Sequence, residues 1–241
     1  MALPGRAQLA LVAACALFAS ASAAPADPTA TARSSDAPAI GAGVALPEPR
    51  RDGTISVERA LEQRRSLREF ASDPLPLASV SQLLWAAQGI TDARGLRTAP
   101  SAGALYPLEL YLVAGAVSGL SPGVYRYDPR GHRLISGAKG DLRAGVAEGA
   151  LDQDWMAEAP AILVLGARYE RTRRKYGERA TRYVQMEVGH AAQNVYLQAT
   201  ALGLGTTMVG AYRDEEIAGL LGLPERVEPL ALLPIGKPPG R

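Results

Sequence analysis

Three arginines surround one serine in the segment 64–70. Arg64 and Arg65 precede Ser66, and Arg68 follows it by two positions. Guanidinium groups bind phosphate oxygens through paired, charge-assisted hydrogen bonds, each worth roughly 1.5 to 3 kcal/mol. The segment therefore predicts a phosphate clamp, while a basic helix end that interacts with the helix dipole would have the same composition.

Two further segments are built from small residues. Because small side chains let a backbone approach a flat ring closely, these segments could hold a planar ligand beside the phosphate clamp. Taken alone, a plain loop before a strand explains the first segment equally well, and a helix C-cap with a tight turn explains the second. The first segment is 100–107, and the second is the glycine-rich exit from the longest helix, 202–210.

The segment 168–182 carries seven basic residues and two glutamates. Such a run suits a nucleic acid or a membrane surface, but it is also typical of a solvated helix face. The whole chain has 26 Lys and Arg against 24 Asp and Glu, a formal net charge of +2. This near balance gives no polyelectrolyte character, so we expect no nucleic-acid partner.

No metal-binding or dinucleotide motif accompanies these segments. His132 and His190 lie far apart in the sequence without a cluster of cysteines or carboxylates, so we expect no metal site. The triplet Gly203-Leu204-Gly205 follows a predicted helix rather than a strand, and it lacks the third glycine of a dinucleotide fingerprint.

The spacing of apolar residues predicts the elements that position these segments. Helices are expected from an N-cap at Ser56 to about residue 65, at 77–87 with Gly89 as the stop, at 182–202 and at 214–221. Strands are expected at 108–113, 124–127, 132–135, 161–165, 206–210 and 230–235. Helices and strands alternate with a hairpin among them, so the fold class is α+β with a mixed sheet. Gly189 inside the longest helix predicts a close packing contact there.

Five motifs in this order resemble the nitroreductase-like FMN flavoprotein family, in particular its branch of SagB-type dehydrogenases with the thiazoline and oxazoline oxidases. They are RRSLREF at 64–70, PSAGALYPLE at 100–109, KYGER at 175–179, GHAAQN at 189–194 and LGLG at 202–205. The resemblance implies a nitroreductase-like fold with a central, largely antiparallel mixed sheet flanked by helices. It also implies a homodimer through the long central helix, with one FMN at each of two sites between the subunits.

The same resemblance implies roles for individual residues. The FMN phosphate, ribityl chain and polar ring edge would contact Arg64, Arg65, Ser66 and Arg68. The partner subunit would contribute Ser101, Ala102 and Gly103, and the isoalloxazine ring would lie beside Met208, Val209 and Gly210. Lys237 would be a second phosphate ligand. In the oxidase branch, the positions that match Lys175 and Tyr176 assist proton removal from the substrate, so these two are the candidate catalytic residues.

The N-terminal residues predict an exported protein. Residues 1–23 combine a positive start, an apolar run too short to span a membrane and a small-residue cleavage signal, as in a Sec-type signal peptide. Cleavage before Cys15, as in a lipoprotein, is the alternative. Residues 24–49 are rich in Ala, Pro, Ser and Thr and predict a flexible linker, which leaves 50–241 as the FMN-binding domain. We expect a periplasmic or extracellular location without a transmembrane segment.

These inferences predict an FMN-dependent oxidoreductase that transfers hydride between a small-molecule or peptide substrate and flavin N5. Nicotinamide cofactors are not expected in an export compartment, which favours a substrate oxidase over an NAD(P)H-dependent nitroreductase. A non-catalytic flavin-binding protein, with its ring face closed by Trp155 or Tyr212, is an alternative from another class. A cofactor-free interaction module that keeps only the dimeric scaffold is another.

Overall fold

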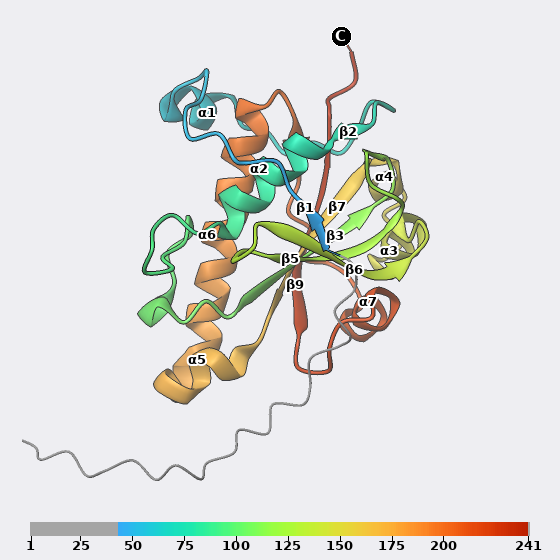
Figure 1. The fold of residues 1–241 in the computed structure, drawn as a ribbon. Helices are drawn as coiled ribbons and strands as arrows, with labels where there is room; N and C mark the ends of the chain where they lie inside the picture. The colour runs from blue at the N-terminus through green and yellow to red at the C-terminus, as the bar shows by residue number, and fades with distance from the viewer. Residues whose placement is uncertain (1–42, 241) are drawn as a thin grey trace, which may run out of the picture. The chain divides into compact units, whose positions relative to one another are not determined.

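A seven-stranded sheet runs through the part of the chain that this computed structural model describes, residues 43–240 (Figure 1). Its strands are β1 (Gly43–Ala45), β3 (Leu108–Ala114), β5 (Gly123–Asp128), β6 (Arg133–Lys139), β7 (Ala161–Ala167), β8 (Gly205–Thr206) and β9 (Glu228–Gly236). Their order across the sheet is β1-β6-β5-β3-β7-β9-β8, and all of these neighbours pair antiparallel. Parallel pairing occurs between β2 (Leu75–Pro76) and β4 (Val117–Ser118) and at the bridge from Ser66 to Thr206. The predicted α+β class with a largely antiparallel, mixed sheet is confirmed.

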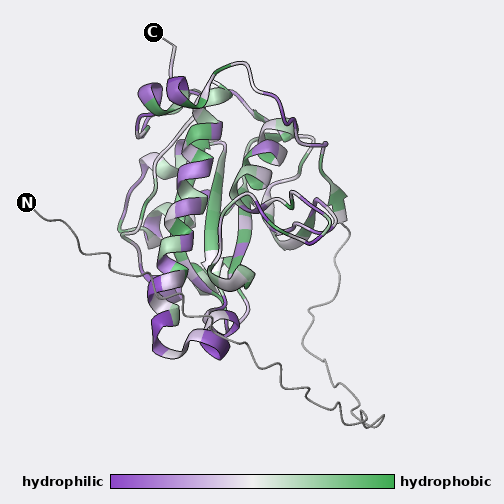
Figure 2. Cartoon of the chain, turned by 90° about the vertical axis from the view of Figure 1, so that its left-hand side faces the viewer, coloured by the Kyte–Doolittle hydropathy of each residue, from purple (hydrophilic) through white to green (hydrophobic). Residues whose placement is uncertain are grey.

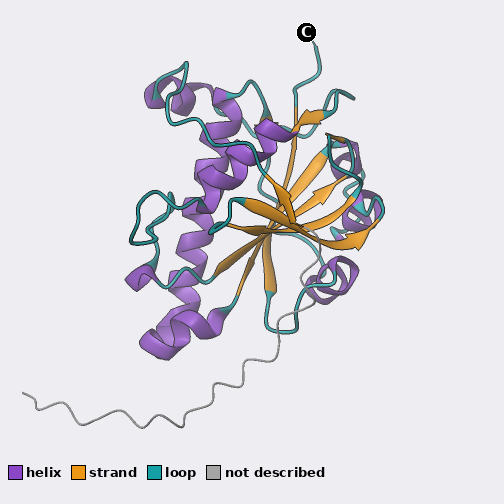
Figure 3. Cartoon of the chain, in the orientation of Figure 1, coloured by secondary structure: helices purple, strands orange, loops and turns teal. Residues whose placement is uncertain are grey.

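Helices cover both faces of this sheet (Figure 3). One layer contains α1 (Val57–Gln63), α2 (Leu77–Gln88), α5 (Tyr169–Tyr176) and the long α6 (Ala180–Ala201). The other contains α3 (Arg143–Gly149), α4 (Trp155–Glu158) and α7 (Asp214–Leu221). Short 3-10 turns occupy Ala102–Ala104 and Gly177–Arg179. None of the described helices combines the length and apolar character that crossing a bilayer requires.

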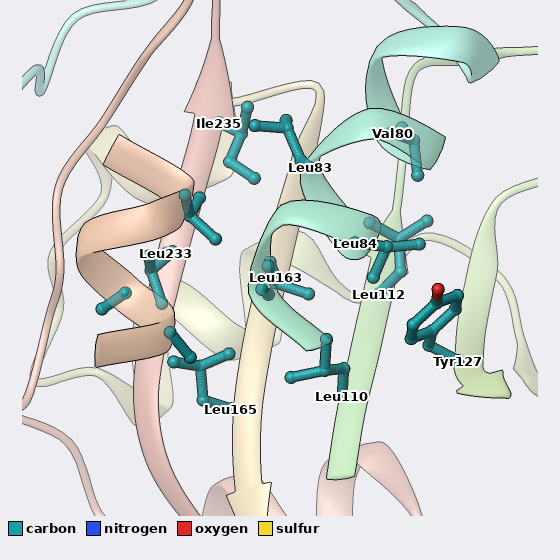
Figure 4. Packing of buried hydrophobic residues seen from close by; sticks show 14 of the residues in the cluster. Val80, Leu83, Leu84, Leu110, Leu112, Tyr127, Leu163, Leu165, Leu233 and Ile235 are labelled. Atoms are coloured by element: carbon teal, nitrogen blue, oxygen red, sulfur yellow. The ribbon is translucent and has the colours of Figure 1, made fainter. Parts of the chain in front are cut away.

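The larger core lies between the sheet and the layer of α2 and α6. Figure 4 shows Leu83 and Leu84 of α2 directed at the strands, where Leu112 and Leu163 meet them; all four are at most 2% exposed. Burying each such side chain contributes roughly 1.5 to 3 kcal/mol. All seven residues of β7 are buried, as the uninterrupted apolar run predicted. This core fixes α6 against the sheet.

Two helix boundaries follow from local chemistry. Ser56 caps α1, since its hydroxyl accepts a hydrogen bond from the Arg59 N–H at 3.2 Å. Gly89 ends α2 as predicted, but with an ordinary φ of −65° rather than a left-handed one. The glycine is required because a Cβ there would lie 2.2 Å from the Trp85 ring.

Two predicted boundaries are wrong. Residues 43–49 were assigned to the flexible linker, but β1 pairs with β6 and Leu46 is only 7% exposed. The signal peptide and the first part of the linker lie outside the described residues. The strand expected at 206–210 ends at Thr206, and only an isolated bridge from Val209 to Leu232 continues it. The chain bulges away between these points because the Met208 N–H bonds a tyrosine hydroxyl instead of a neighbouring strand.

The outward face of α6 is polar and apolar in alternation, as Figure 2 shows. Met186 is 52% exposed on it, and Gly189 and His190 are also exposed. A Cβ at Gly189 would meet no atom within 4 Å, so the packing contact predicted there does not lie within one copy of the described chain.

Candidate functional site

The arginine segment lies along the edge strand β8. The Leu67 N–H donates to the Thr206 carbonyl at 3.1 Å, and the Thr207 hydroxyl donates to the Leu67 carbonyl at 2.6 Å. Gly205 makes this close approach possible, because a Cβ there would lie 2.5 Å from the Leu67 side chain. The structure therefore brings the predicted phosphate clamp beside the glycine-rich exit from α6.

None of the three guanidinium groups on this segment forms an ion pair with a described residue. Arg64 lies over the Tyr196 ring, 5.3 Å from its centre, and Arg68 lies 6.0 Å from the centre of Trp155. Arg65 donates to the backbone carbonyls of Glu62 at 2.9 Å and of its own neighbour Arg64 at 2.8 Å. Cations without a carboxylate partner are the donor set that a phosphate group requires. The residues present thus fit a phosphate-bearing cofactor.

Tyr196 of α6 joins the clamp to the loop after β8. Its hydroxyl accepts a hydrogen bond from the Met208 N–H at 2.7 Å and lies 3.5 Å from the Ser66 hydroxyl. Met208 is 39% exposed, and a Cβ at the exposed Gly210 would find no atom within 4 Å. The chain at Met208 and Gly210 is therefore open to a flat ligand next to the clamp. Val209 itself is buried and points into the core.

Lys237 lies on the same edge by its backbone. The Ala71 N–H donates to the Lys237 carbonyl at 3.0 Å, which places residue 237 beside the end of the arginine segment. Its ammonium group forms an exposed ion pair with Asp73 at 3.3 Å. Lys237 must leave this carboxylate if it is to serve as the expected second phosphate ligand.

The second small-residue segment forms a separate cluster with the candidate catalytic pair. Gly103 has a φ of +63°, and a Cβ there would lie 2.8 Å from the Tyr176 hydroxyl and 3.0 Å from the Lys175 ammonium. Ser101 stabilises the turn by accepting a hydrogen bond from the Tyr106 N–H at 3.0 Å. Ala102 begins the 3-10 turn that carries Gly103. The predicted residues 101–103, Lys175 and Tyr176 are thus neighbours.

No hydrogen bond, ion pair or ring contact links the two clusters within residues 43–240. The first is anchored on α6 at Tyr196 and the second beside Glu187. Nine residues of helix separate these positions, roughly 14 Å along the axis. The chain therefore carries two separate clusters at different positions along the same helix.

Glu187 is a member of the second cluster that the sequence analysis missed. It is 2% exposed, and burial raises its pKa to about 7 against the opposing effects of a Ser101 hydrogen bond and the Arg97 charge. The Gln88 amide donates to its carboxyl group at 3.4 Å. The available signal was an acidic residue on the apolar stripe of the longest helix, next to Val188.

Aromatic side chains line the clamp on its other side. Trp155 stacks on Phe70 with ring centres 6.3 Å apart and faces Arg68, so it lies beside the clamp. Tyr212 packs against the smaller core beneath α3 and α7.

Among the described residues no group of His, Cys, Asp and Glu side chains could hold a metal ion.

Comparison with known proteins identifies one family over most of the chain. The model of the nitroreductase family matches residues 61–237. A relative from Methanocaldococcus jannaschii, named as a nitroreductase, is 50% identical over 183 residues, covering 76% of this chain and 91% of the relative. A crystal structure from Ralstonia eutropha JMP134, also named as a nitroreductase, has a TM-score of 0.73 at 33% identity and covers 83% of this chain and 90% of its own. The E. coli microcin synthetase McbBCD complex with truncated pro-MccB17 bound has a TM-score of 0.63 at 26% identity, covering 80% and 77%.

Proposed function

The chain belongs to the nitroreductase family of oxidoreductases, and from this premise we propose that it is an FMN-dependent oxidoreductase that works as a homodimer. The observation that carries the proposal is the set of three guanidinium groups at 64–68 without carboxylate partners, beside the open chain at Met208 and Gly210. Both features are concentrated at one edge of the sheet, where a phosphate tail and a flat ring would both find partners.

Each of the two clusters has a distinct task in this proposal. The phosphate is held by Arg64, Arg65 and Arg68, with Lys237 joining after release from Asp73. The ring lies against the backbone from Met208 to Gly210, and Ser66 addresses its polar parts. Bound FMN supplies hydride transfer at N5, and the protein supplies position and electrostatics. Residues 101–103 and the clamp are apart within one copy, and we propose that a second copy brings its 101–103 loop to the first copy's clamp.

Lys175 and Tyr176 are proposed to handle the substrate proton. Both contact the space above Gly103, and the Lys175 ammonium lies 5.4 Å from the centre of the Tyr176 ring. In its uncharged form the Lys175 amine can accept a proton as the substrate is oxidised, and the adjacent Tyr176 phenol can relay it. Their proximity to the 101–103 loop puts this pair next to the ring in the proposed dimer.

The substrate side is proposed to follow the SagB-type oxidases and dehydrogenases. The likeness to a microcin synthetase complex and the Lys-Tyr pair beside Gly103 support this branch. The predicted export of the chain supports it as well, since nicotinamide donors are not expected outside the cytoplasm. The names of the other relatives favour a nitroreductase, and an NAD(P)H-dependent nitroreductase is therefore the second candidate.

Anaerobic reduction of the FMN-loaded protein separates the two candidates. Azoline-containing or amine substrates and NADPH are mixed separately with the yellow protein, and the loss of flavin absorbance is followed by stopped flow. The proposal expects rapid bleaching by a substrate of the first group and slow bleaching by NADPH. Fast bleaching by NADPH alone would show that the protein acts as an NAD(P)H-dependent nitroreductase. Binding of FMN without reduction by either group would indicate a flavin-binding protein that is not an enzyme.

A further inference from the structure

A polar cavity of about 460 Å³ opens at the end of the sheet, and none of its lining residues belongs to the arginine clamp. Its walls come from the loop after α2, the start of β3, the end of β5 with its following turn, and α5. A volume of this size is typical of small-molecule sites. Its charged lining consists of Arg97, Arg126, Arg130 and Arg171 with Glu109 and Asp128.

The two carboxylates of this cavity are already neutralised. Glu109 accepts hydrogen bonds from Arg168 at 2.7 Å and from Arg171 at 2.6 Å. Asp128 forms an ion pair with Arg133 at 3.0 Å. Neither carboxylate is therefore left to balance the remaining guanidinium groups.

Of the two half-buried guanidinium groups, Arg97 is partly balanced by the charge of Glu187, whereas Arg126 has no acidic partner within residues 43–240. Arg126 is half-buried and forms no hydrogen bond or ion pair through its side chain within residues 43–240. Arg97 donates to the Gln88 amide oxygen at 2.8 Å and lies 4.6 Å from the centre of the Tyr106 ring, both neutral groups. Burial lowers the pKa of Arg97, with the nearby positive charge of Arg171 acting in the same direction. A half-buried guanidinium group that has no acidic partner and borders open space is stabilised by an anion.

We propose that this cavity binds a small molecule through a carboxylate or phosphate group, with Arg126 as its anchoring cation. Guanidinium groups match both anions in a bidentate manner. The site is separate from the flavin clamp, and its occupancy does not depend on FMN. Because its wall at residues 104–106 continues the 101–103 loop, a ligand here lies directly behind the loop that carries Gly103.

Calorimetric titration of the full chain with pyrophosphate and, separately, with citrate tests this site. The measurement is made with and without saturating FMN, so that pyrophosphate held by the clamp is distinguished. We expect saturable binding of at least one probe with FMN bound, weakened about tenfold or more in Arg126→Gln. Preference for pyrophosphate would indicate a phosphorylated ligand, and preference for citrate a carboxylate ligand.

Two control variants locate the binding. Arg226→Gln removes one charge from an exposed loop outside the cavity and should leave the affinity within about twofold. Arg68→Gln should weaken FMN but not the second site, so failure of the flavin proposal and failure of this one are distinguishable. Equal losses in Arg126→Gln and Arg226→Gln, or no saturable binding of either probe, would overturn the proposal. If Arg126→Gln does not fold, Arg130→Gln, an exposed substitution in the cavity wall, must weaken binding more than Arg226→Gln does.

Discussion

The hydroxyl of Tyr196 accepts a hydrogen bond from the backbone N–H of Met208 at 2.7 Å. This bond redirects the chain after β8, so that Met208 and Gly210 are exposed while Val209 stays buried and bridged to Leu232. The same ring lies beneath the Arg64 guanidinium. One side chain on the central helix thus sets the distance between the phosphate clamp and the backbone proposed to meet the flavin ring.

Replacing this tyrosine should loosen the clamp. Tyr196→Phe keeps the ring under Arg64 but leaves the Met208 N–H without its partner. The hydrogen bond that is lost contributes roughly 1 kcal/mol. We expect FMN to bind about fivefold more weakly in a fluorescence titration, with little change in folding. Tyr125→Phe is the matched control, because the Tyr125 hydroxyl also serves a single backbone group, the Ser121 carbonyl at 2.7 Å, far from the clamp. Equal affinities in both variants would contradict the proposed role.

The clamp itself should tolerate no loss of charge. Arg68→Gln removes a guanidinium that has no carboxylate partner among the described residues, so it should weaken FMN by about tenfold to a hundredfold without lowering the melting temperature. Equilibrium dialysis against FMN measures the first effect and circular dichroism the second. The charge-matched Arg226→Gln should bind FMN normally. Riboflavin, which lacks the phosphate, should bind Arg68→Gln and the unmodified protein with similar affinity.

The candidate catalytic pair should be needed for turnover and not for cofactor binding. Lys175→Met is expected to lower the rate of flavin reduction by an identified substrate about a hundredfold or more, as removal of a general base does. The bound flavin should keep its absorbance spectrum and stoichiometry. Lys139→Met, which changes an exposed lysine at the end of β6, supplies the comparison. An unchanged reduction rate in Lys175→Met would remove Lys175 from the mechanism.

Glu187 should make the stability of the fold depend on pH. Its folded pKa is raised from 4.5 to about 7, so its protonated form stabilises the folded state. That contribution is fully present below pH 4.5 and is lost as the pH rises through about 7, a fall of roughly 3 kcal/mol. Urea unfolding at several pH values should show this fall in the unmodified chain and a flatter profile in Glu187→Gln. The exposed Glu178→Gln should retain the unmodified profile.

The spacing of apolar residues predicted a helix or strand correctly where burial of one apolar surface determines that element. The apolar run 161–165 and the helix stripe through Val184 and Val188 each bury one continuous surface, so periodicity alone identifies β7 and α6. The strand expected at 206–210 failed because Tyr196, twelve residues before Met208, competes for the Met208 N–H. A hydrogen bond between segments of different structure leaves no periodic signal in the sequence.

The candidate site was predicted unevenly for a similar reason. Its motifs identified the clamp, the 101–103 loop and the Lys-Tyr pair as important, and the structure places them in two clusters. Glu187 was missed because a buried carboxyl group and an exposed one look alike in a helix that also carries polar residues on its outer face. Gly89 and Gly205 were recognised as a helix end and part of a turn, yet both are required by close side chains, Trp85 and Leu67.

Subunit complementation tests the central claim, that a clamp from one copy and a loop from a second copy hold each FMN. Arg68→Gln disables the clamp, and Gly103→Val disables the loop, because a side chain there is strained and meets Tyr176. Each variant alone should bind little FMN. After the two are unfolded, mixed equally and refolded, half of the dimers are mixed and each has one intact site, so FMN binding should recover to about a quarter of the unmodified level. No recovery in a mixture that forms folded dimers would contradict the account.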